Sequence, residues 1–294
     1  MADLPETAQH DGRETLPGPA LYLVATPIGN LEDITLRALR VLRHADLIAC
    51  EDTRQTQKLL SHYGITTRTV SYHEHNELTR AAELVINLEQ GARLALVTDA
   101  GMPGISDPGY RLITLAIRHK VPVIPIPGAS AFLAALVASG LPTDSFRFSG
   151  FLPAKEGQRR ELLESIKDSA RTQIFYEAPH RIAEALEDVV SILGPSRHLV
   201  IAREVTKLHE EFLRGRAADL LEIARSRELK GEITLLIAKP EEGEAAPARV
   251  SVADRVCQLM SSEKLDEKAA LKRVAKEFGL GKSEAYRELQ RTKK

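Results

Sequence analysis

The apolar run Leu94-Ala-Leu-Val-Thr98 is followed at once by Asp99-Ala-Gly-Met-Pro-Gly-Ile-Ser-Asp-Pro-Gly109. The first five residues are typical of a short buried strand. The next eleven contain three glycines, two prolines and two aspartates, which neither a strand nor a helix accommodates. We therefore predict a strand that ends in a long polar loop. Asp107 and Pro108 are also compatible with a helix start, with Asp107 as the N-cap.

The same alternation of apolar runs and helical segments extends to both sides of this loop. Strands are expected at 21–24, 47–49, 69–72 and 94–97, with helices at 34–42, 53–62, 77–89 and 108–119. This pattern is typical of a mostly parallel sheet with crossover helices. Polar segments follow each strand, at 26–33, 50–54, 72–76 and 99–109. They are expected to meet at one rim of the sheet, where such folds bind ligands.

A second cycle of strands and helices begins after Pro142. Strands are expected at 146–148, 172–176, 199–202 and 233–237, with an added antiparallel strand at 210–213. Helices are expected near 157–168, 180–192 and 217–226, and the two cycles meet near 125–145. The fold class is therefore α/β, with two α/β domains and a ligand cleft between them.

The expected domain organisation has five parts. They are a disordered leader at 1–19, α/β domains at 20–128 and 129–239, a linker at 240–250 and a small helical module at 251–294. The module carries eleven basic and seven acidic residues, and its helical stripe is Leu265, Ala269, Leu271, Val274, Ala275 and Phe278. A turn at 279–281 and a helix at 283–290 suggest a helix-turn-helix. An exposed basic tail helix or a dimerisation segment is the alternative.

Composition limits the function classes. The 294 residues have a net charge of −1, so nucleic acid could be attracted only by local basic patches. Two distant cysteines argue against a disulfide framework, and no run approaches the ~20 apolar residues of a membrane span. We therefore expect a cytoplasmic protein without membrane contacts.

Several site chemistries lack their sequence signatures. The chain has no glycine-rich dinucleotide fingerprint, no phosphate loop ending in Gly-Lys-Ser/Thr and no Gly-x-Ser-x-Gly elbow. His73 and His75 lie two residues apart without further metal ligands nearby in the sequence. No metal site is expected.

Six motifs in fixed order resemble the bacterial ribosomal RNA small subunit methyltransferase I family, which has the tetrapyrrole-methylase fold. They are residues 24–38 (VATPIGNLEDITLRA), 50–54 (CEDTR), 98–109 (TDAGMPGISDPG), 127–131 (PGASA), 176–181 (YEAPHR) and 203–207 (REVTK). The similarity extends from about Leu21 to Lys239. It implies a homodimer that binds S-adenosylmethionine in the cleft. The implied reaction is methylation of a cytidine 2′-hydroxyl in the decoding region of small-subunit (16S) ribosomal RNA, free or in the assembled subunit.

The resemblance also implies a set of cofactor-binding residues. These are Pro27, Asp99, Gly101, Met102, Ile105, Ser130, Ala131, Glu177, Ala178, Gly231 and Glu232. Tetrapyrrole methylases carry Gly-x-Gly-Pro-Gly-Asp after the first strand, whereas this chain has Thr-Pro-Ile-Gly-Asn-Leu. This difference favours the RNA branch of the fold and weakens any transfer of roles to the first loop.

Methyl transfer to a hydroxyl requires alignment and removal of a proton. Asp52 and His73, followed by Asp33, are the candidate proton acceptors. Their alternative roles are an ion pair of Asp52 with Arg54, a structural hydrogen bond of His73 and an N-cap at Asp33. The candidate substrate contacts are Asn30, Arg54, Lys155 and Arg181.

Two other functions remain open at this point. A small-molecule methyltransferase of the tetrapyrrole type would share the cofactor site, although 4% aromatic residues and no Trp argue mildly against a macrocycle trough. A non-catalytic nucleic-acid-binding protein would explain the basic module but leave the cleft without a role.

Overall fold

The computed structural model describes residues 18–241 and, in the C-terminal region, 255, 256, 259, 260, 266–277, 281, 285–287 and 289. Residues 1–239 and 240–294 form separate compact units. The expected linker lies largely outside the described residues, as does most of the leader. Among the described helices, none is long and apolar enough to cross a bilayer.

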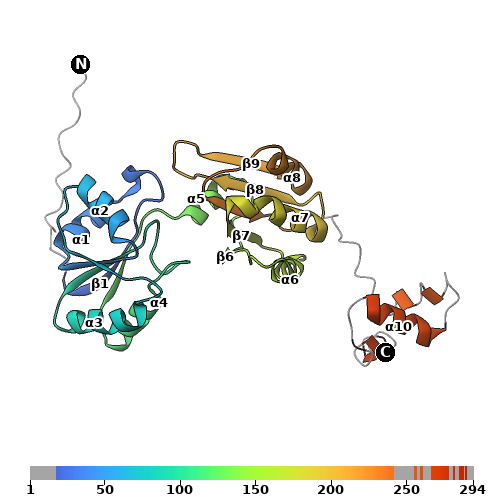
Figure 1. Ribbon diagram of the computed structural model, residues 1–294, viewed down its shortest axis with the longest axis horizontal. Coiled ribbons are helices and arrows are strands. Elements are labelled where there is room, and N and C mark those ends of the chain that lie inside the picture. The colour runs from blue at the N-terminus through green and yellow to red at the C-terminus, as the bar shows by residue number, and fades with distance from the viewer. Residues whose placement is uncertain are drawn as a thin grey trace, which may run out of the picture. The chain divides into compact units, whose positions relative to one another are not determined.

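The first sheet is entirely parallel, as its strand and helix alternation predicts. Its strands are β1 (Ala20–Val24), β2 (Leu47–Cys50), β3 (Thr69–Ser71), β4 (Arg93–Val97) and β5 (Val123–Ile126), in the order β3-β2-β4-β1-β5. Helices α1 (Leu36–His44) and α2 (Thr53–His62) cover one face, and α3 (Glu77–Glu89) and α4 (Tyr110–Arg118) cover the other (Figure 1). The carboxyl ends of β4, β1 and β5 therefore lie side by side.

Strand β5 and helix α5 (Ala131–Ser139) were not expected from the sequence. Pro125 lies within β5, which is at the edge of the sheet, where a strand tolerates proline. Helix α5 has the sequence AFLAALVAS and no polar face, so it lacks the amphipathic period that predicts a helix. Both elements fall in the stretch interpreted as the domain junction.

The second sheet is mixed rather than mostly parallel. Its strands are β6 (Phe146–Phe151), β7 (Thr172–Glu177), β8 (His198–Arg203), β9 (Glu211–Arg216) and β10 (Ile233–Ile237), in the order β6-β7-β10-β8-β9. Only β6 and β7 pair in parallel, and β9 is antiparallel to its neighbour as expected. The short link from β8 to β9 leaves no room for the crossover that a parallel pair requires.

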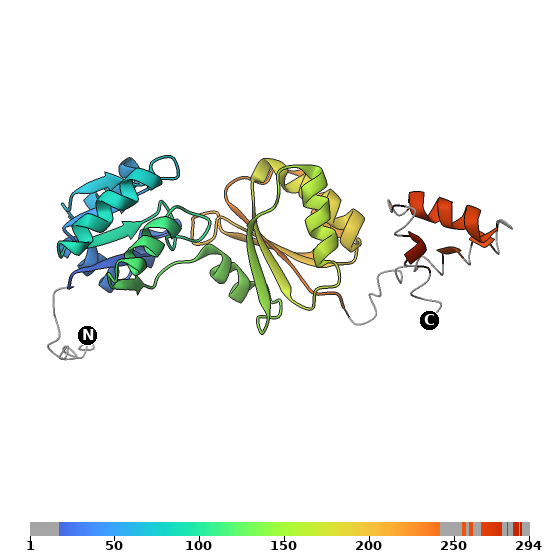
Figure 2. The same ribbon diagram turned by 90° about the horizontal axis from the view of Figure 1, so that it is seen from below.

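Helices pack on both faces of the second sheet (Figure 2). On one face lie α6 (Glu156–Ile166), α7 (Ile182–Leu193) and α8 (Ala217–Ser226), and on the other lies α5. A buried ion pair ties α6 to α7: Arg159 Nε and Arg160 Nη1 each donate to the Asp188 carboxylate at 2.7 Å. The Arg159 and Asp188 side chains are 4% and 7% exposed.

Three local expectations were wrong. Helix α4 begins at Tyr110 with Gly109 at its N-cap, so Asp107 is not the cap. Thr35 caps α1, whereas Asp33 ends a 3-10 turn (Leu31–Asp33). In the C-terminal unit, α10 (Glu267–Glu277) buries Ala270 and Val274 but exposes Ala269. Leu265, Phe278 and most of the expected turn and second helix lie outside the described residues.

Candidate functional site

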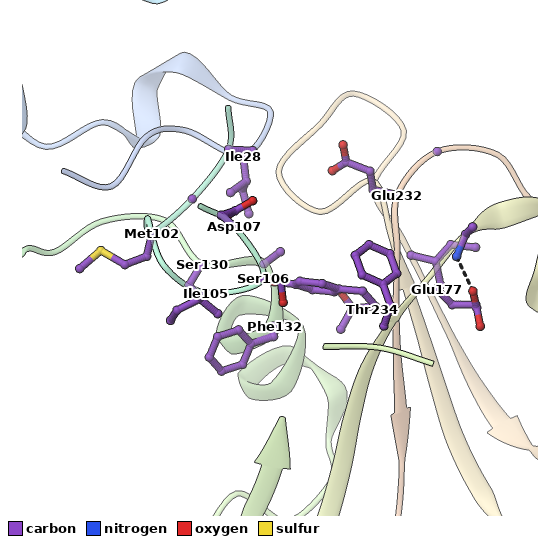
Figure 3. Close-up of a pocket in the computed structure, with 18 of the residues that line it drawn as sticks. Ile28, Met102, Ile105, Ser106, Asp107, Ser130, Phe132, Glu177, Glu232 and Thr234 are labelled. Carbon is purple, nitrogen blue, oxygen red and sulfur yellow. Dashed lines mark hydrogen bonds between the residues drawn. The ribbon is translucent and has the colours of Figure 1, made fainter. Parts of the chain in front are cut away.

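A cavity of about 390 Å³ opens between segments of both α/β domains. Its volume is within the range of roughly 300–1,000 Å³ typical of small-molecule sites. The first domain contributes residues that follow β1 and β4, and the second contributes the start of α5 and residues at the ends of β6, β7 and β10 (Figure 3). The lining residues are Ile28, Ala100, Gly101, Met102, Ile105, Ser106, Asp107, Ser130, Ala131, Phe132, Phe151, Tyr176, Glu177, Ala178, Pro179, Gly231, Glu232, Ile233 and Thr234.

The backbone of loop 99–109 is anchored to the segment that follows β1. Gly101 and Thr26 form an antiparallel bridge in which each N–H donates to the other carbonyl, at 3.1 and 2.9 Å. Gly101 has a φ of +84°, a conformation that residues with a side chain rarely adopt. Further along the loop, Ser106 Oγ lies against Gly150 in β6, 3.4 Å from where a Cβ would be. The loop therefore contacts both domains.

Aromatic side chains form an apolar wall. Phe132 stacks on Phe148 with ring centroids 4.4 Å apart, and Tyr176 makes edge contacts with Phe148 and Phe151 at 4.9 and 5.6 Å. Burial raises the pKa of Tyr176 to about 12, so its hydroxyl stays protonated at neutral pH. This wall was not expected from the sequence, although Tyr176 is the first residue of the motif at 176–181.

Glu177 is buried at the end of β7 and holds the following segment in place. Its Oε1 accepts from the N–H of Ala178 at 2.7 Å and from Arg181 Nε at 2.8 Å. Its Oε2 is buried without a partner in the described part of the chain. Arg181 also donates to the Leu152 carbonyl at 3.3 Å and is only 19% exposed. These contacts match a structural role for the Arg181 guanidinium.

Asp107 places a partly exposed carboxylate in the cavity wall (Figure 3). Desolvation, followed by the nearby charges of Glu51 and Asp99, raises its pKa from 3.8 to about 7. Perturbed carboxyl groups in a cavity are typical of functional sites. From the sequence, Asp107 was expected only as a possible helix cap, because it directly precedes Pro108.

The raised pKa makes a prediction about stability. A folded-state pKa above the unfolded value gives a stabilising contribution that is full below about pH 4 and is lost as the pH rises toward 7. An asparagine cannot ionise, so Asp107→Asn avoids the loss of stability that ionisation of Asp107 causes at high pH. The substitution should therefore raise the melting temperature more at pH 8 than at pH 5. Calorimetric melts at the two pH values measure the difference. Asp144→Asn, the same change at an exposed position, serves as the control, and equal shifts in both variants would contradict the prediction.

Most of the cofactor-binding residues that the resemblance implies come together in the cavity. The nine that line it are Gly101, Met102, Ile105, Ser130, Ala131, Glu177, Ala178, Gly231 and Glu232. Pro27 and Asp99 do not line it, although the next residues, Ile28 and Ala100, do. Asp99 instead accepts a hydrogen bond from the N–H of Asp52 at 3.2 Å.

The three candidate proton acceptors lie outside the cavity lining. Asp52 caps α2, and its hydrogen bonds from Arg54 lower its pKa to about 2, which makes it a weak base. His73 contacts the Asn76 side chain at 3.3 Å through Nε2, and its Nδ1 is buried without a partner among the described residues. Asp33 lies in the turn before α1. The structural alternatives for Asp52 and His73 match their contacts.

The remaining substrate candidates are spread over the surface. The Asn30 side chain accepts from the Glu32 N–H at 3.1 Å and caps a turn. Arg54 is 86% exposed and paired with Asp52 at 2.7 Å, and Lys155 is exposed at the start of α6. Arg54 and Lys155 remain accessible to a polyanion.

The cavity suits a ligand that combines an apolar ring system, polar edges and a positive charge. The aromatic wall offers stacking surface, and the bridged loop exposes backbone groups for polar edges. The described lining contains three carboxylates and no basic residue, which favours a cation. S-adenosylmethionine has these properties, so the residues present fit the group that the resemblance implies.

Comparison with known proteins is consistent with this fit. Residues 20–221 match the family model described as tetrapyrrole (corrin/porphyrin) methylases. The chain is 50% identical over 270 residues to ribosomal RNA small subunit methyltransferase I of Halalkalibacterium halodurans, covering 90% of this chain and 93% of that protein. It is 44% identical over 283 residues to the protein of the same name from Escherichia coli O157:H7, covering 95% and 97%.

Solved structures share the fold at low sequence identity. A diphthine synthase superposes with a TM-score of 0.59 at 17% identity, covering 76% of this chain and 91% of that one. A cobalt precorrin-4 methyltransferase superposes with a TM-score of 0.57 at 16% identity, covering 74% of this chain and 94% of that one.

Proposed function

Because this chain belongs to the ribosomal RNA small subunit methyltransferase I family of the tetrapyrrole methylases, we propose that it methylates a cytidine 2′-hydroxyl in the decoding region of small-subunit ribosomal RNA. The methyl donor of this family is S-adenosylmethionine. The observation that carries the proposal is the gathering of nine implied cofactor residues, from both domains, around one cavity.

The cofactor would be held largely by backbone and apolar groups. The segment at Gly101 and Met102 would contact it from the first domain, and Glu177 with Ala178 and Gly231 with Glu232 from the second. The bound sulfonium supplies an activated methyl group. The protein has to align a hydroxyl oxygen in line with that methyl, keep competing water away and accept a proton. The aromatic wall serves the exclusion of water.

A labelling experiment distinguishes this function from its rivals. Incubation with radiolabelled S-adenosylmethionine and small ribosomal subunits that lack the modification should transfer label to the RNA, with large subunits as the control. Label in an added tetrapyrrole and none in RNA would favour the small-molecule enzyme. Binding of RNA without any transfer would favour the non-catalytic protein.

The proposed assembly is a homodimer. Large apolar side chains are exposed on neighbouring helices α3 and α4: Leu78 is 69% exposed, Tyr110 78% and Ile117 60%. Exposed apolar surface of this kind is typical of protein contacts. Sedimentation of the full chain should give the mass of two copies.

The C-terminal unit is proposed to dock on RNA. Its described helix α10 carries the exposed side chains of Lys268, Lys272 and Arg273, and phosphate contacts by such groups make binding salt-dependent. Truncation after Lys239 should leave the affinity for S-adenosylmethionine unchanged but weaken subunit binding and flatten its salt dependence. A truncated monomer with an unchanged salt slope would instead assign this unit to the dimer.

A further inference from the structure

Asp107 is the one carboxylate of the described cavity lining that has no bonding partner. Glu177 is bound by Arg181 and the Ala178 N–H, and Glu232 lies 3.3 Å from Lys207 Nζ. Within the described residues, Asp107 has neither a hydrogen bond nor an ion pair, and it retains access to solvent. A partnerless carboxylate in a ligand cavity is free to accept a proton from the ligand.

The backbone around Asp107 is constrained on both sides. The preceding residue, Ser106, has a φ of +61°, which is uncommon for a residue with a side chain, and it contacts Gly150 of the second domain. Pro108 restricts Asp107 from the other side. Gly109, with a φ of +146°, approaches Leu96 so closely that a Cβ there would lie 3.2 Å from its side chain. Strain of this kind persists where the surrounding structure over-determines it, often at active sites.

The charges that face Asp107 favour a base of intermediate strength. Glu51 follows β2, Asp99 follows β4, the Tyr176 hydroxyl faces it from β7, and Glu232 shares the cavity. The negative charges of Glu51 and Asp99 oppose its ionisation, and no described cation lines the cavity to reverse their effect. The resulting pKa of about 7 matches what general-base catalysis at neutral pH requires.

We propose that the Asp107 carboxylate is the catalytic base that deprotonates the acceptor hydroxyl during methyl transfer. This role rests on the proposed function. In the step, the hydroxyl O–H bond breaks and its proton passes to Asp107, while the oxygen forms a bond to the methyl carbon. The carbon–sulfur bond breaks, and its electron pair stays on sulfur to give a neutral thioether. Asp107 then releases the proton to solvent.

The test compares Asp107→Asn, which keeps the side-chain shape, with the wild type. Single-turnover methylation of small subunits is measured across pH 5 to 9 at saturating S-adenosylmethionine. The wild-type rate should rise with pH to a plateau, with a midpoint below about 7 because a bound cation favours the carboxylate. The variant should lose about 100-fold or more of the plateau rate together with this pH dependence. Melting curves and the affinity for S-adenosylhomocysteine establish that the variant is folded.

Glu51→Gln is the second variant, because it removes one like charge without entering the cavity lining. It should keep the plateau rate and move the midpoint to lower pH, an effect that a purely structural role of Asp107 would not produce.

Three outcomes overturn the role of Asp107. One is an Asp107→Asn plateau rate within about tenfold of the wild type. Another is an Asp107→Asn variant that binds S-adenosylmethionine more weakly, binds S-adenosylhomocysteine normally and regains the wild-type rate at saturating S-adenosylmethionine. Asp107 would then only balance the positive charge of the sulfonium. The third is a wild-type protein that transfers no methyl group to small subunits, which refutes the proposed function and this role with it.

Discussion

Gly101→Val is expected to weaken the binding of S-adenosylmethionine by about 100-fold or more. The position has a φ of +84°, which a β-branched residue can adopt only under strain. A valine there would also press on Ile28 and the Ala129 carbonyl, which lie 3.5 and 3.7 Å from the position of a Cβ. Relief of this strain requires movement of the loop, which would break its bridge to Thr26. Isothermal titration of the folded variant measures the loss.

Gly91→Val is the matched control. Gly91 has a φ of +90° in a turn after α3, and no atom lies within 4 Å of where its Cβ would be. The Gly91→Val variant should therefore have a lower melting temperature, because of its strained backbone, but keep the wild-type affinity for S-adenosylmethionine. Normal affinity in folded Gly101→Val would separate this loop from the cofactor site.

Asp188→Ala is expected to lower the free energy of unfolding by about 3–5 kcal/mol. Asp188 neutralises the buried Arg159 and also binds Arg160, each at 2.7 Å. Without it, the Arg159 charge stays buried and uncompensated between α6 and α7. Urea unfolding followed by circular dichroism measures the change.

The neighbouring residue provides the control for this second change. Glu187 is 49% exposed and pairs with Arg225 at 2.7 Å. Exposed ion pairs contribute about 1 kcal/mol or less, so Glu187→Ala should have a small effect. If Asp188→Ala and Glu187→Ala lowered the free energy of unfolding equally, burial would not explain the strength of the Asp188 ion pairs.

The first domain was largely predictable because its strands are apolar runs and most of its helices are amphipathic. Helices α2 and α3 begin and end at the expected residues. Strand β5 was missed because it contains a proline, which is unusual in a strand. Helix α5 was missed because it is apolar on all sides and shows no amphipathic period. The mixed pairing of the second sheet was missed because an apolar run carries no information about strand direction.

The residues that line the cavity were more predictable than a candidate proton acceptor within it, and the strand order explains why. Many of the cavity residues follow β4, β1 and β5, which are neighbours in the first sheet. Asp52 and His73 follow β2 and β3, at the other side of the sheet, beyond β4. Sequence identifies which residues end strands, but it does not give the order of those strands. Asp107, the proposed base, was missed for a different reason, since its sequence context is also that of a helix cap.

The chain is proposed to transfer a methyl group to a cytidine 2′-oxygen in small-subunit RNA. Mass spectrometry of nucleosides tests this proposal most directly, after incubation of unmodified small subunits with S-adenosylmethionine that carries a deuterated methyl group. Deuterated 2′-O-methylcytidine is expected in the RNA of the decoding region, and far less of it is expected with Gly101→Val at a limiting concentration of the methyl donor. Deuterium on a base, in another nucleoside or nowhere in the RNA would contradict the proposal.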